Sequence, residues 1–246
     1  MKLGFLARFI LFALLSTIII ASAAFALGAF DNSSIQSSLD VSADTTCVRY
    51  KTVIIDAGHG GEDGGASSAA GLIEKNVNLE IAQMLRDMLS ASGVNVVMTR
   101  EDDRLLYDRN VDFKGRKKKL DLAARLKIAE ETPDSIFVSI HMNSYTNPKY
   151  SGLQVWYSQN NPESYTLAHG IQSAVQSRLQ PENKRTIKAA TSSIFLLDNA
   201  KSPAVLVECG FLSNPEEATR FEDDSYKQLI AFTIFSSLMD FIEASG

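Results

Sequence analysis

The sequence has few of the residues that often mark a recognisable chemistry. Its 246 residues include two cysteines, one tryptophan and three histidines, and the formal net charge is −5. Two cysteines, Cys47 and Cys209, are too few for a disulfide framework, and the negative charge removes the electrostatic argument for nucleic-acid binding. No G-x-x-x-x-G-K-[ST] phosphate loop is present, and no G-x-G-x-x-G motif opens a helix, so support for nucleotide binding is weak.

The first thirty residues differ from the rest of the chain. Lys2 and Arg8 precede an uncharged apolar segment, residues 9–30, which is long enough to cross a bilayer. Small residues near its end fit the A-x-A cleavage pattern, so both a cleaved signal peptide and an uncleaved membrane anchor stay open. Either one exports the rest of the chain, to the cell wall or to the space between the membranes of a forespore. Residues 31–48 are rich in Ser, Asp, Ala and Thr and are expected to form a flexible linker.

Short apolar runs alternate with amphipathic segments along the remaining chain, residues 49–246. Strands are expected at residues 49–56, 94–99, 135–140, 152–157 and 204–209, and helices at residues 72–92, 120–131, 162–179 and 226–242. Residues 213–217 carry helix-start chemistry. A strand–helix–strand series with short links predicts parallel strands joined by a right-handed crossover, and hence an α/β domain. The basic run at residues 116–119 is expected to be a solvated loop or helix start, with contact to an anionic wall polymer or lipid surface as the alternative.

A glycine-rich loop follows the first predicted strand. Residues 53–66 have the sequence VIIDAGHGGEDGGA, in which His59 lies among five glycines. Glycine allows positive φ angles and a close approach of the backbone to a ligand. A histidine held at the end of a strand suits a metal ligand or a general base, and the loop alone does not decide between them.

Three further residues are expected near His59. Glu74 begins the first helix, His141 follows a predicted strand, and Glu208 lies near the end of the apolar run AVLVEC. Ligands of open α/β sheets bind beyond the carboxyl ends of the strands, so these side chains are expected at one edge. His59, Glu74 and His141 then form a three-donor set that suits Zn²⁺ and leaves a fourth position for water.

Each residue also has a simpler interpretation. Glu74 could supply only favourable charge near a helix N-terminus. Glu208 fits a simpler interpretation least well, because a glutamate inside the apolar run AVLVEC is costly to bury unless it has a partner. His169, in the middle of a predicted helix, is expected to be structural or at the surface. Cys209 is expected to be a buried free thiol.

Four motifs taken together resemble the zinc-dependent N-acetylmuramoyl-L-alanine amidases of the type-3 amidase family. They are VIIDAGHGGEDGGA, GLIEKNVNLEIA, FVSIHMNS and AVLVECGFLSNPEEA, in family order within about residues 50–243. The resemblance implies one mostly parallel, twisted sheet with helices on both faces. It implies that His59, Glu74 and His141 bind Zn²⁺ and that Glu208 is the catalytic general base and acid. Asp56 and Asn143 flank the two histidines and either orient them or satisfy loop backbone groups.

The implied reaction is hydrolysis of the amide between the lactyl group of N-acetylmuramic acid and L-alanine of the peptidoglycan stem peptide. The architecture, an apolar leader with one catalytic domain, is most similar to the sporulation-associated CwlD subgroup, which prepares muramic-δ-lactam in spore cortex. Residues 100–119 are too few for a full occluding domain, and an activating protein partner stays open. We expect no nucleic-acid partner, and membrane contact only through the N-terminal segment. A zinc peptidase acting on wall peptides and a non-catalytic peptidoglycan-binding module are the alternatives.

Overall fold

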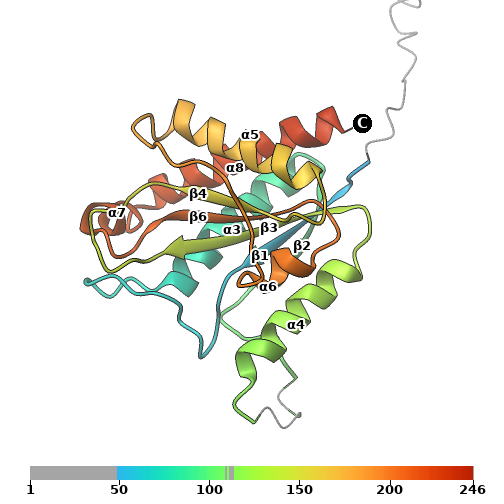
Figure 1. The fold of residues 1–246 in the computed structure, drawn as a ribbon, viewed down its shortest axis with the longest axis horizontal. Helices are drawn as coiled ribbons and strands as arrows, with labels where there is room; N and C mark the ends of the chain where they lie inside the picture. Colours follow the sequence, from blue (N-terminus) through green and yellow to red (C-terminus); the bar gives the residue numbers. More distant parts are fainter. Residues whose placement is uncertain (1–48, 109, 111–113, 246) are drawn as a thin grey trace, which may run out of the picture. The chain divides into compact units, whose positions relative to one another are not determined.

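The computed structural model describes residues 49–108, 110 and 114–245 (Figure 1). The described residues form one compact unit. A six-stranded sheet runs through it in the order β2-β1-β3-β6-β4-β5. The strands are β1 (Thr52–Ala57), β2 (Asn95–Met98), β3 (Ser135–Asn143), β4 (Gln154–Tyr157), β5 (Lys188–Ala189) and β6 (Ala204–Phe211).

The first four strands in this order are parallel, and β4 and β5 run antiparallel to them. The β1–β2 pair and the helix between them, α3 (Glu74–Ala91), form the predicted parallel strand–helix–strand unit. A sheet that is mostly parallel has both faces covered, because its crossover helices pack on them.

Two apolar layers hold the helices against the sheet. Helices α3, α5 (Glu163–Arg178) and α8 (Asp224–Ala244) cover one face, and their buried residues join alternate strand residues such as Val53 and Ile55. Helices α4 (Lys117–Glu130) and α6 (Phe195–Asn199) lie on the other face, against Ile54, Phe137 and Leu206 (Figure 1). The short α7 (Pro215–Arg220) follows β6. The predicted single α/β domain with helices on both faces is confirmed.

Several predicted boundaries were wrong. The strand expected to stop at His141 continues to Asn143, and the strand expected to end at Cys209 continues to Phe211, so His141 and Glu208 lie inside strands. The first strand begins at Thr52 rather than at Arg49. Neither β5, which has only two residues, nor α6 was predicted. The basic run forms the N-cap and first turn of α4, as the helix-start interpretation expected.

The predictions for residues 1–48, including the apolar leader, the linker and Cys47, lie outside the described residues. None of the helices in the described ranges is long and apolar enough to span a membrane. The topology has one direct consequence for function. Because β1, β3 and β6 are parallel neighbours, their carboxyl ends meet at one edge of the sheet, where ligands of such sheets bind.

Candidate metal centre and active site

The glycine loop after β1 places His59 at this edge with an unusual backbone conformation. His59 has φ +62°, a left-handed value that non-glycine residues adopt rarely and at some cost. Two glycines make the packing around it possible. A Cβ on Gly58 would lie 2.3 Å from the ring of His141, and a Cβ on Gly65 would lie 2.5 Å from Glu74 Oε2. The glycines therefore let the loop close directly onto the side chains of the site.

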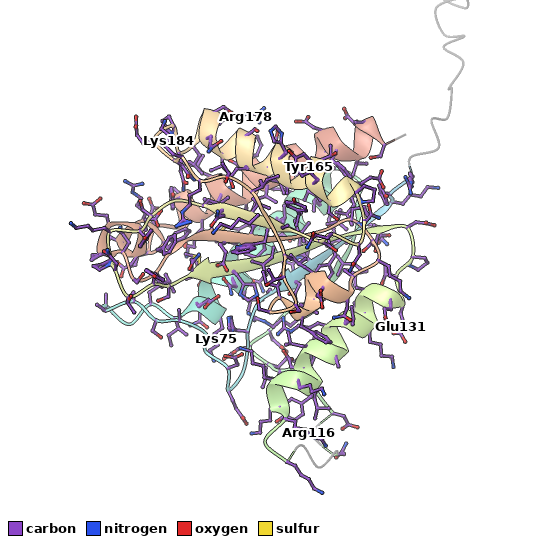
Figure 2. All side chains as sticks on the ribbon, in the orientation of Figure 1. Lys75, Arg116, Glu131, Tyr165, Arg178 and Lys184 are labelled. Atoms are coloured by element: carbon purple, nitrogen blue, oxygen red, sulfur yellow. The ribbon has the colours of Figure 1, made fainter. Side chains whose placement is uncertain are left out.

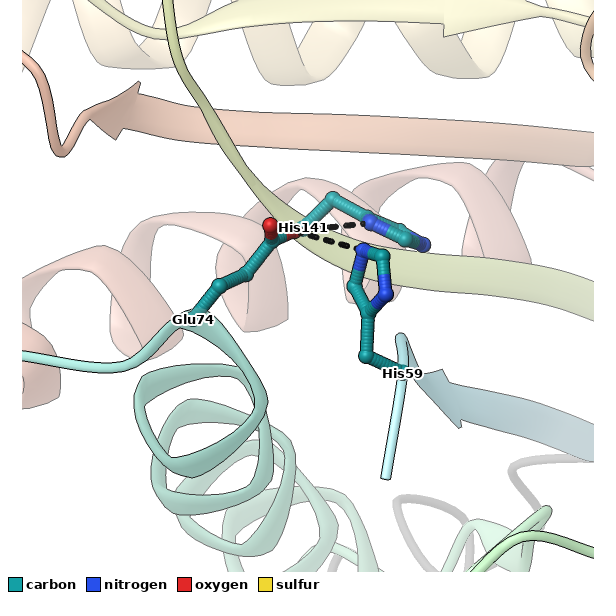
Figure 3. Close-up of side chains that lie close together, drawn as sticks. All are labelled: His59, Glu74 and His141. Atoms are coloured by element: carbon teal, nitrogen blue, oxygen red, sulfur yellow. Dashed lines mark hydrogen bonds and ion pairs between the residues drawn. The ribbon is translucent and has the colours of Figure 1, made fainter. Parts of the chain in front are cut away.

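Glu74 begins α3, which starts at the same edge of the sheet. Its Oε1 lies 3.2 Å from His59 Nε2 and 3.0 Å from His141 Nδ1, as drawn in Figure 3, and it also accepts the Met142 N–H. Its Oε2 accepts the Ala66 N–H at 2.8 Å. Burial opposes ionisation of this carboxyl, but the bonds and charges of His141 and His59 outweigh it and hold the pKa of Glu74 well below its usual range.

His59, Glu74 and His141 form a group that could hold a metal ion, with one donor atom of each within 4.8 Å of the others. Two imidazoles and a carboxylate are a donor set typical of Zn²⁺, and three protein ligands leave the open position that catalytic zinc sites keep. The set fits the predicted ion in both chemistry and spacing. The assignment of these three residues as ligands stays a prediction.

Glu208 lies next to this group. It is in direct register with His141 on β3, and neighbouring strands are about 4.8 Å apart. Its Oε2 is buried and, in the described part of the chain, accepts no hydrogen bond. Burial raises the pKa of Glu208, with the nearby Glu74 charge adding to the effect and the two histidines opposing it. Glu208 therefore has a raised pKa, an oxygen that accepts no hydrogen bond among the described residues, and a position beside the candidate metal group. Such a carboxyl is suited to take up and return a proton.

Two buried arginines bind backbone carbonyls of the glycine loop, and neither was predicted from the sequence. Arg125 of α4 donates to the carbonyls of Ala57 at 2.8 Å and His59 at 2.6 Å. Arg100, just after β2, donates to the carbonyls of Ala57 at 2.8 Å and Gly58 at 3.0 Å. Burial and the neighbouring Arg125 lower the pKa of Arg100 to about 10, so it is still charged at neutral pH. The i, i+4 pair of Asp121 and Arg125 was the available signal in the sequence.

Asp56 and Asn143 have different surroundings. Asp56 is fully buried, and its carboxylate accepts hydrogen bonds from Arg125, Thr99 and Ser139 at 2.6–2.8 Å. Arg125 also binds the His59 carbonyl, so it links Asp56 to the His59 loop. Asn143 uses its backbone carbonyl to accept the Leu212 N–H.

The predictions for His169 and Cys209 are confirmed. His169 lies exposed on α5 and stacks on Tyr165. Cys209 is a buried free thiol, and burial raises its pKa far above the usual range.

Residues 53–240 match the family model described as N-acetylmuramoyl-L-alanine amidase, which is most of the chain. The chain belongs to this amidase family. The amidase is therefore a hydrolase of the family named for the N-acetylmuramoyl–L-alanine bond of peptidoglycan, and the resemblance that its four motifs indicated is confirmed. Its glycine loop, the start of α3 and the ends of β3 and β6 all lie within the matched residues.

Named relatives agree with this membership. The amidase is 34% identical, over 196 residues, to the germination-specific N-acetylmuramoyl-L-alanine amidase of Bacillus subtilis (strain 168), covering 80% of this chain and 81% of the relative. It is similar to the structure of the CwlD amidase from Clostridioides difficile in complex with the GerS lipoprotein, with TM-score 0.75, 36% identity and coverage of 79% and 99%. An N-acetylmuramoyl-L-alanine amidase from Clostridium difficile 630 matches with TM-score 0.69, 29% identity and coverage of 80% and 100%.

Proposed function

We propose that this amidase hydrolyses the amide between the lactyl group of N-acetylmuramic acid and L-alanine, with Zn²⁺ held by His59, Glu74 and His141 and with Glu208 as the base. The observation that carries the proposal is the position of Glu208. The carboxyl of Glu208, whose buried Oε2 has no hydrogen-bond partner among the described residues, lies one strand away from a His–Glu–His group at the ligand edge of the sheet. Burying such a group is costly, and a role in proton transfer explains why it is there.

Held by His59, Glu74 and His141, zinc would supply Lewis-acid polarisation of the substrate carbonyl and a lowered pKa for a bound water. The protein residues supply the other parts of the reaction. Glu208 accepts the proton of the attacking water and returns it to the departing alanine nitrogen. Its raised pKa suits both steps, because the carboxylate is then more basic and the acid form persists closer to neutral pH. Glu74 Oε1 lies 3.2 Å from His59 Nε2 and 3.0 Å from His141 Nδ1, so the proposed donor atoms already face one another.

The test is mass spectrometry of muropeptides after digestion of purified peptidoglycan by wild type and by Glu208→Gln. Wild type should release intact stem peptides with a free L-alanine amine. Glu208→Gln should retain stoichiometric zinc by metal analysis and lose hydrolysis, since the amide keeps the shape of the side chain but cannot take the proton. Removal of one catalytic proton-transfer group costs about 10²- to 10⁴-fold in rate.

Glu131→Gln is the matched control for this test. Glu131 is the exposed C-cap residue of α4 (Figure 2), well away from the start of α3 where the labelled Lys75 lies. This variant should hydrolyse peptidoglycan at the rate of wild type. Full activity in Glu208→Gln would refute the assignment of the base. Protein that carries no zinc and gains no activity when zinc is added would refute the metal site.

The two alternative functions make different predictions in the same experiment. A zinc peptidase would cut inside the stem peptide and leave L-alanine attached to the lactyl group. A non-catalytic binding module would retain peptidoglycan in a pull-down assay but release no fragment. The favourable geometry of Glu208 beside the His–Glu–His group supports hydrolysis over binding alone, and the family membership supports the amide over a peptide bond.

We further propose that the enzyme is exported and acts in spore cortex maturation, where removal of stem peptides precedes muramic-δ-lactam formation. The germination-specific relative and the apolar residues 9–30 support this proposal. The related CwlD structure contains a lipoprotein, which supports a protein partner for this chain as well. Cortex muropeptides from a strain lacking this protein should contain no muramic-δ-lactam, and unchanged lactam would refute the cortex role. Alkaline phosphatase fused to the C-terminus, which becomes active only after export, should be active, and an inactive fusion would refute export.

A further inference from the structure

A row of side chains leads from the candidate metal group across the sheet. His141 on β3 is in register with Glu208 on β6, and Glu208 is in register with Gln154 on β4. Residues directly opposite each other in neighbouring strands project from the same face. With about 4.8 Å between strands, Gln154 lies roughly 10 Å from His141, on the far side of Glu208.

Arg185 is fixed at the end of this row. It lies between α5 and β5, and its Nη1 donates to Gln154 Oε1 at 2.8 Å while its Nε donates to the Ser151 carbonyl at 2.9 Å. Its guanidinium also lies over the ring of Phe211, 4.5 Å from the centroid. Three contacts therefore hold a planar, charged group in one place, so little conformational entropy is left to lose when a ligand binds.

None of these partners neutralises Arg185. Among the described residues its contacts are a carbonyl, an amide side chain and an aromatic ring. Burial lowers the pKa of Arg185, with Glu217 and Glu208 among the charges that oppose this. Both oxygens of Glu217 already accept backbone N–H groups, from Gly152 and Phe211. Arg185 is thus a positioned cation without a close carboxylate, near enough to Glu208 for their charges to interact.

A pocket of about 820 Å³ opens at Arg185. Its lining includes four further cations, Lys149, Lys184, Lys188 and Arg220, in a protein whose net charge is −5. Three acidic residues also line it, and one of these is the internally bonded Glu217. The pocket is therefore more cationic than the protein as a whole, and it favours an anionic ligand.

We propose that Arg185 is the anchor of a subsite that binds the stem peptide through the free carboxylate of the acidic residue following L-alanine. This inference rests on the proposed amidase function, because it uses Glu208 to fix where the cleaved bond lies. From that bond, two residues of peptide extend at most about 7 Å. This reach brings the carboxylate of the second residue, D-glutamate in bacterial stem peptides, to the Gln154–Arg185 end of the row. The guanidinium fork matches a carboxylate in shape and charge.

The subsite makes a prediction about specificity. A peptide whose second residue carries a free carboxylate should bind better than the same peptide with that group amidated, since the amide loses the charge-assisted hydrogen bond. Hydrogen bonds to charged groups contribute enough to change an affinity by about 10- to 100-fold. The discrimination should depend on Arg185 and not on the general charge of the pocket.

The experiment is calorimetric titration of the zinc-loaded protein with the tripeptide L-alanyl-γ-D-glutamyl-L-lysine and with its amidated counterpart, L-alanyl-D-isoglutaminyl-L-lysine, in which the γ-carboxyl of the second residue is in the peptide bond. Wild type should prefer the free acid by about 10- to 100-fold. Arg185→Gln should bind both peptides equally and as weakly as wild type binds the amide. Arg185→Lys keeps the charge without the planar fork and should retain a reduced preference. Lys184→Gln, which alters an exposed cation of the same pocket (Figure 2), should retain the full preference.

Each outcome decides the proposal. A wild type that binds acid and amide equally, or a Lys184→Gln variant that loses as much preference as Arg185→Gln, would overturn the subsite. Circular dichroism of Arg185→Gln distinguishes a lost contact from a lost fold. Arg185→Lys tests separately whether the planar guanidinium is needed for the preference. Because binding is measured without turnover, a protein that discriminates the peptides but cleaves no muropeptide would refute the amidase mechanism and leave the subsite standing.

Discussion

Replacing Arg125 with methionine tests whether the buried ion network holds the metal-binding loop. Arg125 is 1% exposed and makes ion pairs with Asp56 at 2.7 Å and Asp121 at 2.8 Å, besides its bonds to the carbonyls of Ala57 and His59. Methionine fills similar space but leaves Asp56 as a buried charge without its cation. Breaking a buried pair in this way costs about 3–5 kcal/mol of unfolding free energy.

That loss is a large share of the stability of an ordinary domain, which is about 5–15 kcal/mol. For a domain of this size it corresponds to a fall in Tm of about 6–20 °C. The zinc affinity should fall as well, by about 10- to 100-fold, because the His59 carbonyl loses the bond that fixes the backbone of a ligand. Thermal unfolding followed by circular dichroism measures the first effect, and competition with a chromogenic chelator measures the second.

Arg104→Met is the matched control for the Arg125 variant. Arg104 is exposed and pairs only with Asp102 at 3.1 Å, so its loss should cost less than about 1 kcal/mol and leave zinc affinity unchanged. The double variant Arg125→Met with Asp56→Asn removes both charges, and its cost should be smaller than the sum of the two single costs. If Arg125→Met proved as stable as Arg104→Met and bound zinc as wild type does, the network would not be holding the loop.

Three further predictions concern other parts of the site and fold. Gly58→Ala places a methyl group 2.3 Å from the ring of His141, so zinc affinity should fall at least tenfold. Gly170→Ala on α5, where a Cβ meets nothing within 4 Å, should keep that affinity and add about 0.5–1 kcal/mol of stability. The folded state depresses the pKa of Asp56, so its charge stabilises the fold above its unfolded pKa of about 3.9 and less as the pH falls below it. The stability gap between wild type and Asp56→Asn should therefore narrow from pH 7 to pH 3 in denaturant titrations. Asn214→Ala removes the side chain that caps α7 through two backbone N–H groups and should cost about 1 kcal/mol in the same assay.

Each of these predictions has a contradicting result. Equal zinc affinity in the two glycine variants would show that the ring of His141 can move without loss of binding. A stability gap that stays constant between pH 7 and pH 3 would show that folding does not lower the pKa of Asp56. An Asn214→Ala variant as stable as wild type would show that water replaces the cap at no cost.

The sequence predicts the candidate site residues better than it predicts the residues that hold them in place. His59 follows β1, Glu74 begins α3, and His141 and Glu208 lie near the carboxyl ends of β3 and β6. Parallel strands bring these ends together, so the topology places the four residues. Arg125 follows no such rule. A charged residue within a helical segment is normally solvated, and its burial here depends on a tertiary meeting with Asp56, 69 residues away.

The antiparallel edge of the sheet shows the same limit. Gln154 has an ordinary strand pattern, and its register opposite Glu208 follows only from the pairing of β4 with β6. Residues 179–187 have no periodic pattern, so nothing in them marks Arg185 as the residue that contacts Gln154. Strand ends are predictable from local patterns, whereas partners across the sheet depend on long-range pairing.

The central place of β6 has a consequence for when the enzyme becomes active. β3 and β4 are consecutive strands along the chain, yet β6 lies between them, although it is the last strand to be synthesised. The middle of the sheet cannot close until the C-terminal part of the chain is available, and such long-range pairing makes folding slow. Glu208 arrives on that same strand. A chain synthesised only as far as β4 therefore already contains all three candidate metal ligands but lacks Glu208, the residue proposed as the base.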